Sequence, residues 1–305
     1  MMSDVSLSTS PSPRSGARPR IAGAPISWGV CEVPGWGHQL PAHRVLSEMR
    51  SLGLEATEFG PDGFLPGDPH EKAALLADHG LAAVGGFLPV VLHDPAHDPV
   101  AEVDAFADAC VAAGAGVVVL AAVTGSDGYD ARPELSAAQW RTLLSNLDAL
   151  SARLAGRGLL GVVHPHIGTL VESDADVRRV LEGSGIALCV DTGHLVAAGA
   201  DPVAITLAHP DRVGHVHLKD VDAAQAARVV GGQVAFSAAV AEGLWKPLGE
   251  GSVDLTAMVA ALERAGYRGW YVLEQDLMLK DGPPQGEGPA AEVRRCLSWL
   301  RGALA

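Results

Sequence analysis

The segment His215–Asp220, with the sequence HVHLKD, carries ionisable side chains at alternating positions. In an extended strand alternate side chains point to the same face, so His215, His217 and Lys219 would share one face. Imidazole and amine groups gathered in this way are suited to binding a metal ion and to handling a substrate beside it. A solvated strand face would give the same pattern, so this segment alone leaves both interpretations open.

Other strand-like segments end in similar chemistry. Three segments end in polar residues: LLGVVHPH in His164 and His166, IALCVDTGH in Asp191 and His194, and GWYVLEQD in the stretch that begins at Glu274. Trp28 and Glu58 lie at the ends of the first two apolar segments. Imidazole and carboxylate ligands favour Mn²⁺, Fe²⁺, Co²⁺ or Zn²⁺ over Mg²⁺ or Ca²⁺. A single His or Asp often has a structural role, but four successive strands with such endings indicate one shared site.

Apolar segments that alternate with helical patterns define the elements that would position these residues. The strand candidates are 21–29, 54–60, 81–89, 116–123, 159–166, 186–194, 212–220 and 269–276, and the helical patterns are 41–53, 98–116, 136–158, 173–185, 201–211, 254–269 and 290–305. Eight strands in this alternation predict an α/β fold, a (β/α)8 TIM barrel forming a single domain over residues 20–305. An open doubly wound sheet is the alternative, but no GxGxxG follows the first strand.

A barrel would place its active site at the carboxyl ends of the strands. The polar strand endings would then meet at one rim. Two irregular insertions, 222–252 and 277–288, also follow strands and are expected on the same face.

Composition excludes several classes of function. The net charge of −14 disfavours nucleic acid as a partner, since phosphate binding requires clustered Lys and Arg. The four cysteines are far apart, which indicates reduced thiols and a cytoplasmic location. Residues 1–19 are rich in Ser, Pro and Arg and are expected to form a disordered tail rather than a secretory signal. No apolar run approaches the roughly 20 residues that span a bilayer, and a homo-oligomer is compatible with the sequence.

The sequence resembles the xylose-isomerase-like TIM-barrel superfamily of sugar isomerases, epimerases and endonuclease-type enzymes, and within it the inosose dehydratase family. The resembling segments span almost the whole chain after the tail: APISWG (24–29), GLEATEFG (53–60), HPHIGTLVE (164–172), VDTGHL (190–195), DRVGHVHLKD (211–220), GEGSVDL (249–255) and GWYVLEQD (269–276). The resemblance implies a divalent metal held by one residue from each of strands five to eight, usually Glu, Asp, His and Glu.

Three of these ligands map directly onto Asp191, His217 and Glu274. The fourth departs from the superfamily pattern, because His164 stands where many relatives have glutamate. The inosose dehydratase family also has a histidine-rich segment here. Alternation places His164 and His166 on the same side, so periodicity does not decide between them, and we favour His164 as the ligand.

This substitution bears on the reaction. Epimerases of the superfamily use two metal-bound glutamates to move protons on both faces of the substrate. Replacing one of them by histidine favours a one-way elimination, although a histidine could still serve as the second base. The resemblance therefore implies a lyase of inositol catabolism, a dehydratase that removes water from 2-keto-myo-inositol with Mn²⁺ or Co²⁺, or alternatively Zn²⁺ or Fe²⁺.

The remaining residues receive roles on this interpretation. Glu274 is the expected base, and His194 and Lys219 are the expected proton donors. We expect neighbouring cationic groups to lower the pKa of Lys219, while a salt bridge with Asp220 or Glu250 is the structural alternative. His215 is expected to be a buried residue that supports the ligands.

Four side chains are expected to bind the small polyol or keto-sugar substrate: Trp28, Glu58, His166 and Glu172. Trp28 would stack on the sugar or plug the barrel mouth, Glu58 could instead cap a loop, and Glu172 could instead face solvent. The rival functions are a sugar isomerase or epimerase, an endonuclease-type phosphodiesterase, which the negative charge disfavours, and a binding module without activity.

Overall fold

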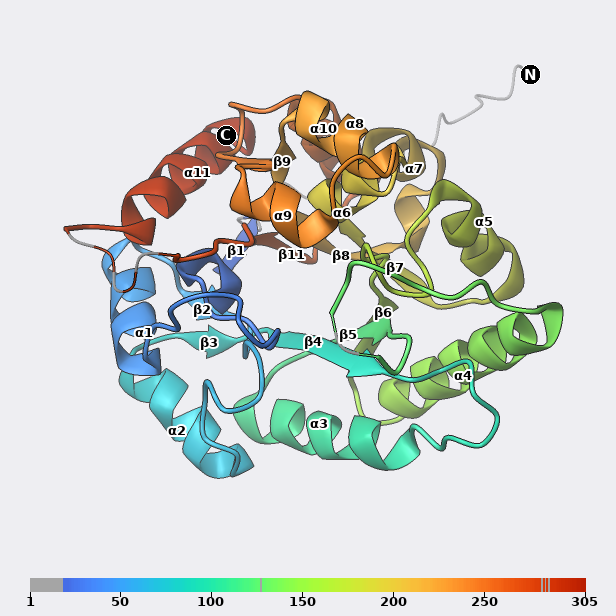
Figure 1. The fold of residues 1–305 in the computed structure, drawn as a ribbon. Helices are drawn as coiled ribbons and strands as arrows, with labels where there is room; N and C mark the ends of the chain where they lie inside the picture. The colour runs from blue at the N-terminus through green and yellow to red at the C-terminus, as the bar shows by residue number, and fades with distance from the viewer. Residues whose placement is uncertain (1–18, 127, 281, 283, 285) are drawn as a thin grey trace, which may run out of the picture.

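A parallel sheet curls into a barrel that is surrounded by helices (Figure 1). The computed structural model describes residues 19–305 apart from 127, 281, 283 and 285. Its parallel strands are β1 (Arg20–Gly23), β2 (Ala56–Thr57), β3 (Ala82–Ala83), β4 (Gly85–Val90), β5 (Val117–Ala122), β6 (Leu160–Val163), β7 (Ala187–Asp191), β8 (Val213–Leu218) and β11 (Trp270–Leu273). This arrangement confirms the predicted single-domain TIM barrel. The predicted tail, residues 1–19, lies outside the described residues except for its last position.

Segments β3 and β4 form one barrel strand that is interrupted at Val84. Segment β3 pairs with β2, whereas β4 pairs with β5. Val84 joins both sides, since its amide donates to Thr57 O and its carbonyl accepts from Val117 N. The change of partner closes the ring, so the described strands correspond to the eight that the sequence predicted.

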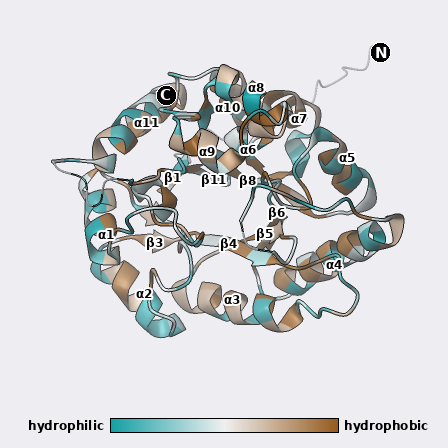
Figure 2. Cartoon of the chain, viewed as in Figure 1, coloured by the Kyte–Doolittle hydropathy of each residue, from teal (hydrophilic) through white to brown (hydrophobic). Residues whose placement is uncertain are grey.

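Helices cover the outside of the barrel. They are α1 (Ala42–Ser51), α2 (Pro69–Asp78), α3 (Val100–Ala113), α4 (Ala137–Ala155), α5 (Asp174–Gly183), α6 (Thr192–Ala197), α7 (Pro202–Ala208), α10 (Leu255–Ala265) and α11 (Pro289–Ala303), with 3-10 turns η1 (Pro25–Trp28) and η2 (Pro210–Arg212). Figure 2 shows hydrophilic residues on their outer faces and apolar residues toward the strands. Most of these helices therefore bury one face against the sheet, whereas the short α6 is buried on nearly all sides.

The insertion at 222–252 is more regular than expected. It contains α8 (Ala223–Val230), α9 (Phe236–Ala241) and β10 (Trp245–Lys246), which pairs antiparallel with β9 (Asp220–Val221). Asp222 accepts hydrogen bonds from two amides at the start of α8, and this cap accounts for the first helix. The insertion thus forms a small, ordered unit beside the end of β8.

Apolar packing occurs on both sides of the strands. The barrel interior is filled by small side chains, including Val84, Val119, Val162 and Val272. A much larger cluster of buried Leu, Val and aromatic side chains lies between the strands and the helices. A packed interior of this kind leaves the carboxyl ends of the strands as the place where polar side chains collect.

Candidate active site

Strand β7 ends at Asp191, whose two carboxylate oxygens have different partners. Oδ1 accepts hydrogen bonds of 2.8 Å from the backbone amides of Gly193 and His194 and so caps the first turn of α6. The cap fixes the side chain and leaves Oδ2 available to groups from neighbouring strands. The DTGH sequence therefore places a rigid carboxylate oxygen at this strand end.

Two further side chains with ligand atoms converge on this oxygen. Pairing of β7 with β8 sets Asp191 beside His217, and Glu274 directly follows β11, the next strand in the sheet. His217 Nδ1 lies 3.7 Å from Asp191 Oδ2 and against Glu274 Oε2. One ligand atom from each of the three residues lies within 4.8 Å of the others, which is close enough for all three to share a cation.

His164 lies at the edge of the same group, with Nε2 3.4 Å from Asp191 Oδ2. His164 Nδ1 is buried without a hydrogen-bond partner, and His217 Nδ1 and Glu274 Oε2 have no partner other than each other. Buried polar atoms with so few partners are unfavourable, so the pair formed by His217 and Glu274 beside Asp191 indicates a place for a bound group. Two imidazoles and two carboxylates form a donor set that fits Mn²⁺, Fe²⁺, Co²⁺ or Zn²⁺.

Glu58 supports His217 from behind. Its Oε1 lies 2.9 Å from His215 Nε2 and 3.0 Å from His217 Nε2. Burial alone would raise the pKa of Glu58, but the two histidines hold it well below its usual range, so the carboxylate accepts hydrogen bonds from both rings. His217 is thereby held with Nδ1 toward Asp191 and Glu274. Glu58 was expected to hold substrate, and it also borders the cavity described below.

Lys219 is fully buried between carboxylates. Its Nζ lies 2.6 Å from Asp191 Oδ2, 3.1 Å from Glu274 Oε1 and 3.3 Å from Asp276 Oδ1. Burial lowers the pKa of this amine, but the three carboxylates outweigh burial and raise it. The expectation of a lowered pKa is therefore wrong, because the negative partners were not apparent from the neighbouring histidines. These partners also differ from those of the structural alternative, a salt bridge with Asp220 or Glu250.

Asp276 is a member of the site that the sequence analysis did not assign. It contacts Lys219 and lies 3.3 Å from His194 Nε2 through its other oxygen. It also lines the cavity. Its place two residues after Glu274, in the EQD ending, was the signal that could have identified it.

His166 and His194 stack next to this group, with ring centroids 3.7 Å apart. His166 Nδ1 lies 2.7 Å from the Ile167 carbonyl oxygen, to which it donates, so Nε2 is left as an acceptor. Burial lowers the pKa of both histidines well below the usual value, with smaller contributions from nearby cationic groups. Of the two, His166 borders the cavity directly.

Two expected substrate-binding residues lie elsewhere. Trp28 is fully buried, and its Nε1 donates to Glu48 Oε2 at 2.8 Å, so its ring packs in the core and does not line the cavity. Glu172 pairs with Arg132 at 2.8 Å and accepts from the Gly168 amide. These contacts assign structural partners to both side chains, which a local sequence pattern could not provide.

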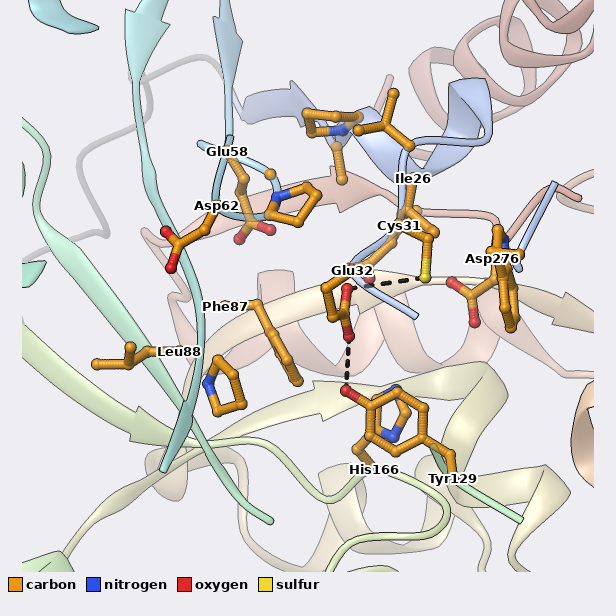
Figure 3. A pocket seen from close by; sticks show the side chains of 18 of the residues that line it. Ile26, Cys31, Glu32, Glu58, Asp62, Phe87, Leu88, Tyr129, His166 and Asp276 are labelled. Atoms are coloured by element: carbon orange, nitrogen blue, oxygen red, sulfur yellow. Dashed lines mark hydrogen bonds between the residues drawn. The ribbon is translucent and has the colours of Figure 1, made fainter. Parts of the chain in front are cut away.

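A cavity of about 160 Å³ opens beside the carboxylates. Aromatic side chains form much of its wall, and Glu58, Glu274 and Asp276 contribute polar groups. Figure 3 shows Glu58, Phe87, Tyr129 and Asp276 around the cavity. The aromatic residues are Trp36, Phe87, Phe106, Tyr129 and Phe236. The small volume suits a compact molecule rather than a polymer, and the mixture of apolar walls with a few polar groups is typical of small-molecule sites.

A hydrogen bond crosses the wall of this cavity. Tyr129, from the segment between β5 and α4, donates to Glu32 Oε1 at 2.6 Å, and Glu32 belongs to the segment between η1 and α1 (Figure 3). The Tyr129 ring also packs on His166, with centroids 4.4 Å apart. Sequence patterns gave no sign of this bond, because its partners are 97 positions apart.

These features define a TIM barrel with a candidate active site at the carboxyl ends of its strands. The chain belongs to the family described as xylose isomerase-like TIM barrel, whose family model matches residues 46–302. Within the described residues, no helix has both the length and the apolar character needed to cross a membrane.

Curated relatives cover most of the chain. A protein named rhizopine catabolism protein MocC from Rhizobium meliloti is 35% identical over 270 residues, which cover 84% of this chain and 81% of the relative. The inosose dehydratase of Geobacillus kaustophilus (strain HTA426) is 31% identical over 270 residues, covering 84% and 87%.

Solved structures agree on the fold. An L-ribulose 3-epimerase superposes with a TM-score of 0.66 at 16% identity and covers 94% of both chains. A protein named IOLI with a bound zinc atom gives a TM-score of 0.66 at 13% identity, covering 93% of this chain and 98% of that one. At these identities the likeness concerns the barrel, so the chemistry has to be argued from the site.

Proposed function

We propose that this protein is a metal-dependent dehydratase that eliminates water from a keto-inositol of the 2-keto-myo-inositol type. The observation that carries the proposal is the meeting of Asp191, His217 and Glu274 beside His164, which stands in place of a second glutamate. The relatives named inosose dehydratase support the same reaction. His164, Asp191, His217 and Glu274 would hold Mn²⁺ or Co²⁺, with Zn²⁺ and Fe²⁺ as alternatives.

The chain supplies the groups for proton transfer. When bound, the metal would supply Lewis-acid stabilisation of negative charge on the ketone oxygen. Glu274, which borders the cavity, would accept the proton from the carbon next to the ketone. This step leaves the electron pair of the broken C–H bond to expel the hydroxyl group on the following carbon.

The departing hydroxyl group needs a proton, because hydroxide is a poor leaving group. Lys219 and His194 are the proposed donors, and both contact Asp276 at the edge of the cavity. Lys219 Nζ lies 3.1 Å from Glu274 Oε1, so the proton that Glu274 gains can return to the lysine after water has left. The aromatic wall would pack on the carbon faces of the ring, and His166 and Glu58 would bind its hydroxyl groups.

The test is to incubate Mn²⁺- or Co²⁺-loaded protein with 2-keto-myo-inositol and to follow the ultraviolet absorbance of the dehydrated diketone. We expect turnover that is lost in Asp191→Asn and on chelation. A panel of ketohexoses tests the alternative function. Interconversion of the ketohexoses with no change in the keto-inositol would replace the dehydratase by a sugar isomerase or epimerase.

A further inference from the structure

The Lys219 ammonium group contacts the same side chains that would hold the metal. It lies 2.6 Å from Asp191 Oδ2 and 3.1 Å from Glu274 Oε1, and the lysine has no exposed surface. A buried ammonium group at these positions neutralises part of the charge that a metal would neutralise. The ammonium group and a metal ion would therefore compete for the same oxygen atoms.

Asp191 makes this competition direct. Its Oδ1 is committed to the amides of Gly193 and His194, so only Oδ2 can bind a cation without breaking the cap of α6. Lys219 contacts that Oδ2, which also faces His217 Nδ1 and His164 Nε2. A divalent ion placed here would meet a positive charge in a buried, weakly screened environment.

Asp276 offers Lys219 a second position. Its Oδ1 is 3.3 Å from Nζ, and Asp276 belongs to none of the clusters of ligand atoms among the described residues. The start of the lysine cannot shift, because its amide and carbonyl are both hydrogen-bonded to Thr192 Oγ1 and its stem packs closely on Gly193. Movement is thus confined to the end of the side chain, which can swing from Asp191 toward Asp276.

We propose that Lys219 is a built-in counter-ion of the metal site, which holds Asp191 and Glu274 together without metal and shifts from Asp191 onto Asp276 when a divalent cation binds. This inference rests on the proposed metal-dependent function. Lys219 then sets the metal affinity, and Asp276 is a positioning residue that acts through it. Lys219 thus lowers the affinity for metal, but it keeps the site ordered when no metal is bound.

The experiment measures Mn²⁺ dissociation constants by competition with a fluorescent chelator, together with the melting temperature of metal-free protein. Lys219→Met keeps the apolar stem and removes the charge, so we expect Mn²⁺ binding to tighten by about tenfold or more and the metal-free protein to melt at a lower temperature. Lys246→Met is the matched control, because Lys246 pairs with Asp222 away from the cavity, and it should change neither value.

Asp276→Asn gives a second and independent readout. It deprives Lys219 of its alternative partner, so Mn²⁺ binding should weaken several-fold, whereas in the Lys219→Met background the same change should have almost no effect. Equal weakening in both backgrounds, or unchanged or weaker Mn²⁺ binding by Lys219→Met, would overturn the role of Lys219 while leaving the metal site intact. Absence of Mn²⁺, Co²⁺ or Zn²⁺ binding by the unaltered protein would overturn the proposed function itself.

Discussion

The histidine that faces the proposed metal position depends on a chain of side-chain contacts. Glu58 accepts from Nε2 of both His215 and His217, and this fixes which nitrogen of His217 faces Asp191. A ring held in this way loses little freedom when it binds a cation, and the carboxylate behind it raises the basicity of the ligand nitrogen. On the proposed function, Glu58 would therefore support metal binding by orienting His217.

Glu58→Gln tests this support. The amide keeps the size of the side chain but removes the charge, so we expect Mn²⁺ affinity to fall by about 10- to 100-fold, the usual cost of losing such a partner. Isothermal titration with Mn²⁺ provides the measurement. Glu55→Gln, at an exposed position three residues earlier, is the control and should bind normally. Unchanged affinity in Glu58→Gln would show that His217 is oriented by other contacts.

At the residue scale, the sequence predicted which side chains meet at the ends of the strands. Asp191, His217 and Glu274 could be grouped because parallel strands in a barrel end at one rim. Partners across the barrel could not be read from local patterns. The three carboxylates around Lys219, the bond of Trp28 to Glu48 and the contact of Asp276 with His194 all depend on side-chain directions that only the packed structure provides.

At the scale of elements the closure of the barrel depends on one glycine. Gly85, at the start of β4, has φ +130, and a Cβ atom there would lie 1.7 Å from the Val117 carbonyl oxygen. Only a residue without a side chain allows the chain to change partners between β3 and β4 while β5 stays close. The sequence predicted one continuous strand over 81–89. The interruption between β3 and β4 was missed, because two consecutive glycines in a strand indicate a bend but do not show where the strand changes partners.

Gly85→Ala should be severely destabilising. The unfavourable backbone conformation and the forced separation from β5 should together lower the free energy of unfolding by about 3 kcal/mol or more. Urea unfolding followed by circular dichroism measures the change. Gly116→Ala, at the edge of β5, meets no atom within 4 Å and should differ little from the unaltered protein. Similar stability of the two variants would disprove the role of Gly85 in closure.

Two connecting segments meet at the cavity through Tyr129 and Glu32. Tyr129→Phe keeps the ring on His166 but removes the donor, so the wall should become looser while the groups proposed to transfer protons stay in place. We expect KM to rise about fivefold, the equivalent of one net hydrogen bond, with kcat nearly unchanged.

Steady-state kinetics with the keto-inositol separates the two parameters for this substitution. Tyr267→Phe removes a hydroxyl group that donates to the Trp270 carbonyl, away from the cavity, and serves as the control. A fall in kcat with constant KM in Tyr129→Phe would instead assign its hydroxyl group to the chemistry.

At the scale of the whole molecule, the net charge of the protein and the charged groups that line the cavity have the same sign. The protein carries a net charge of −14, and the described residues that line the cavity include carboxylates but neither lysine nor arginine. The excess of acidic over basic residues was the reason to exclude nucleic acid as a partner. The structure shows that this excess extends into the cavity. Lys219, which contacts the lining carboxylates of Glu274 and Asp276, is already engaged by three carboxylates.

A phosphorylated substrate should therefore be rejected because of its charge rather than its size. A phosphate group in this cavity would lie near Glu32 and Asp62 with no guanidinium or free ammonium to bind it. We expect kcat/KM for a phosphate ester of the keto-inositol to be at least about 100-fold below that of the neutral ketone, equivalent to roughly 3 kcal/mol of repulsion and lost hydration. A neutral ether of similar bulk at the same position should lose much less, and added salt should partly restore turnover of the ester. Equal losses for the ester and the ether would assign the selectivity to shape alone.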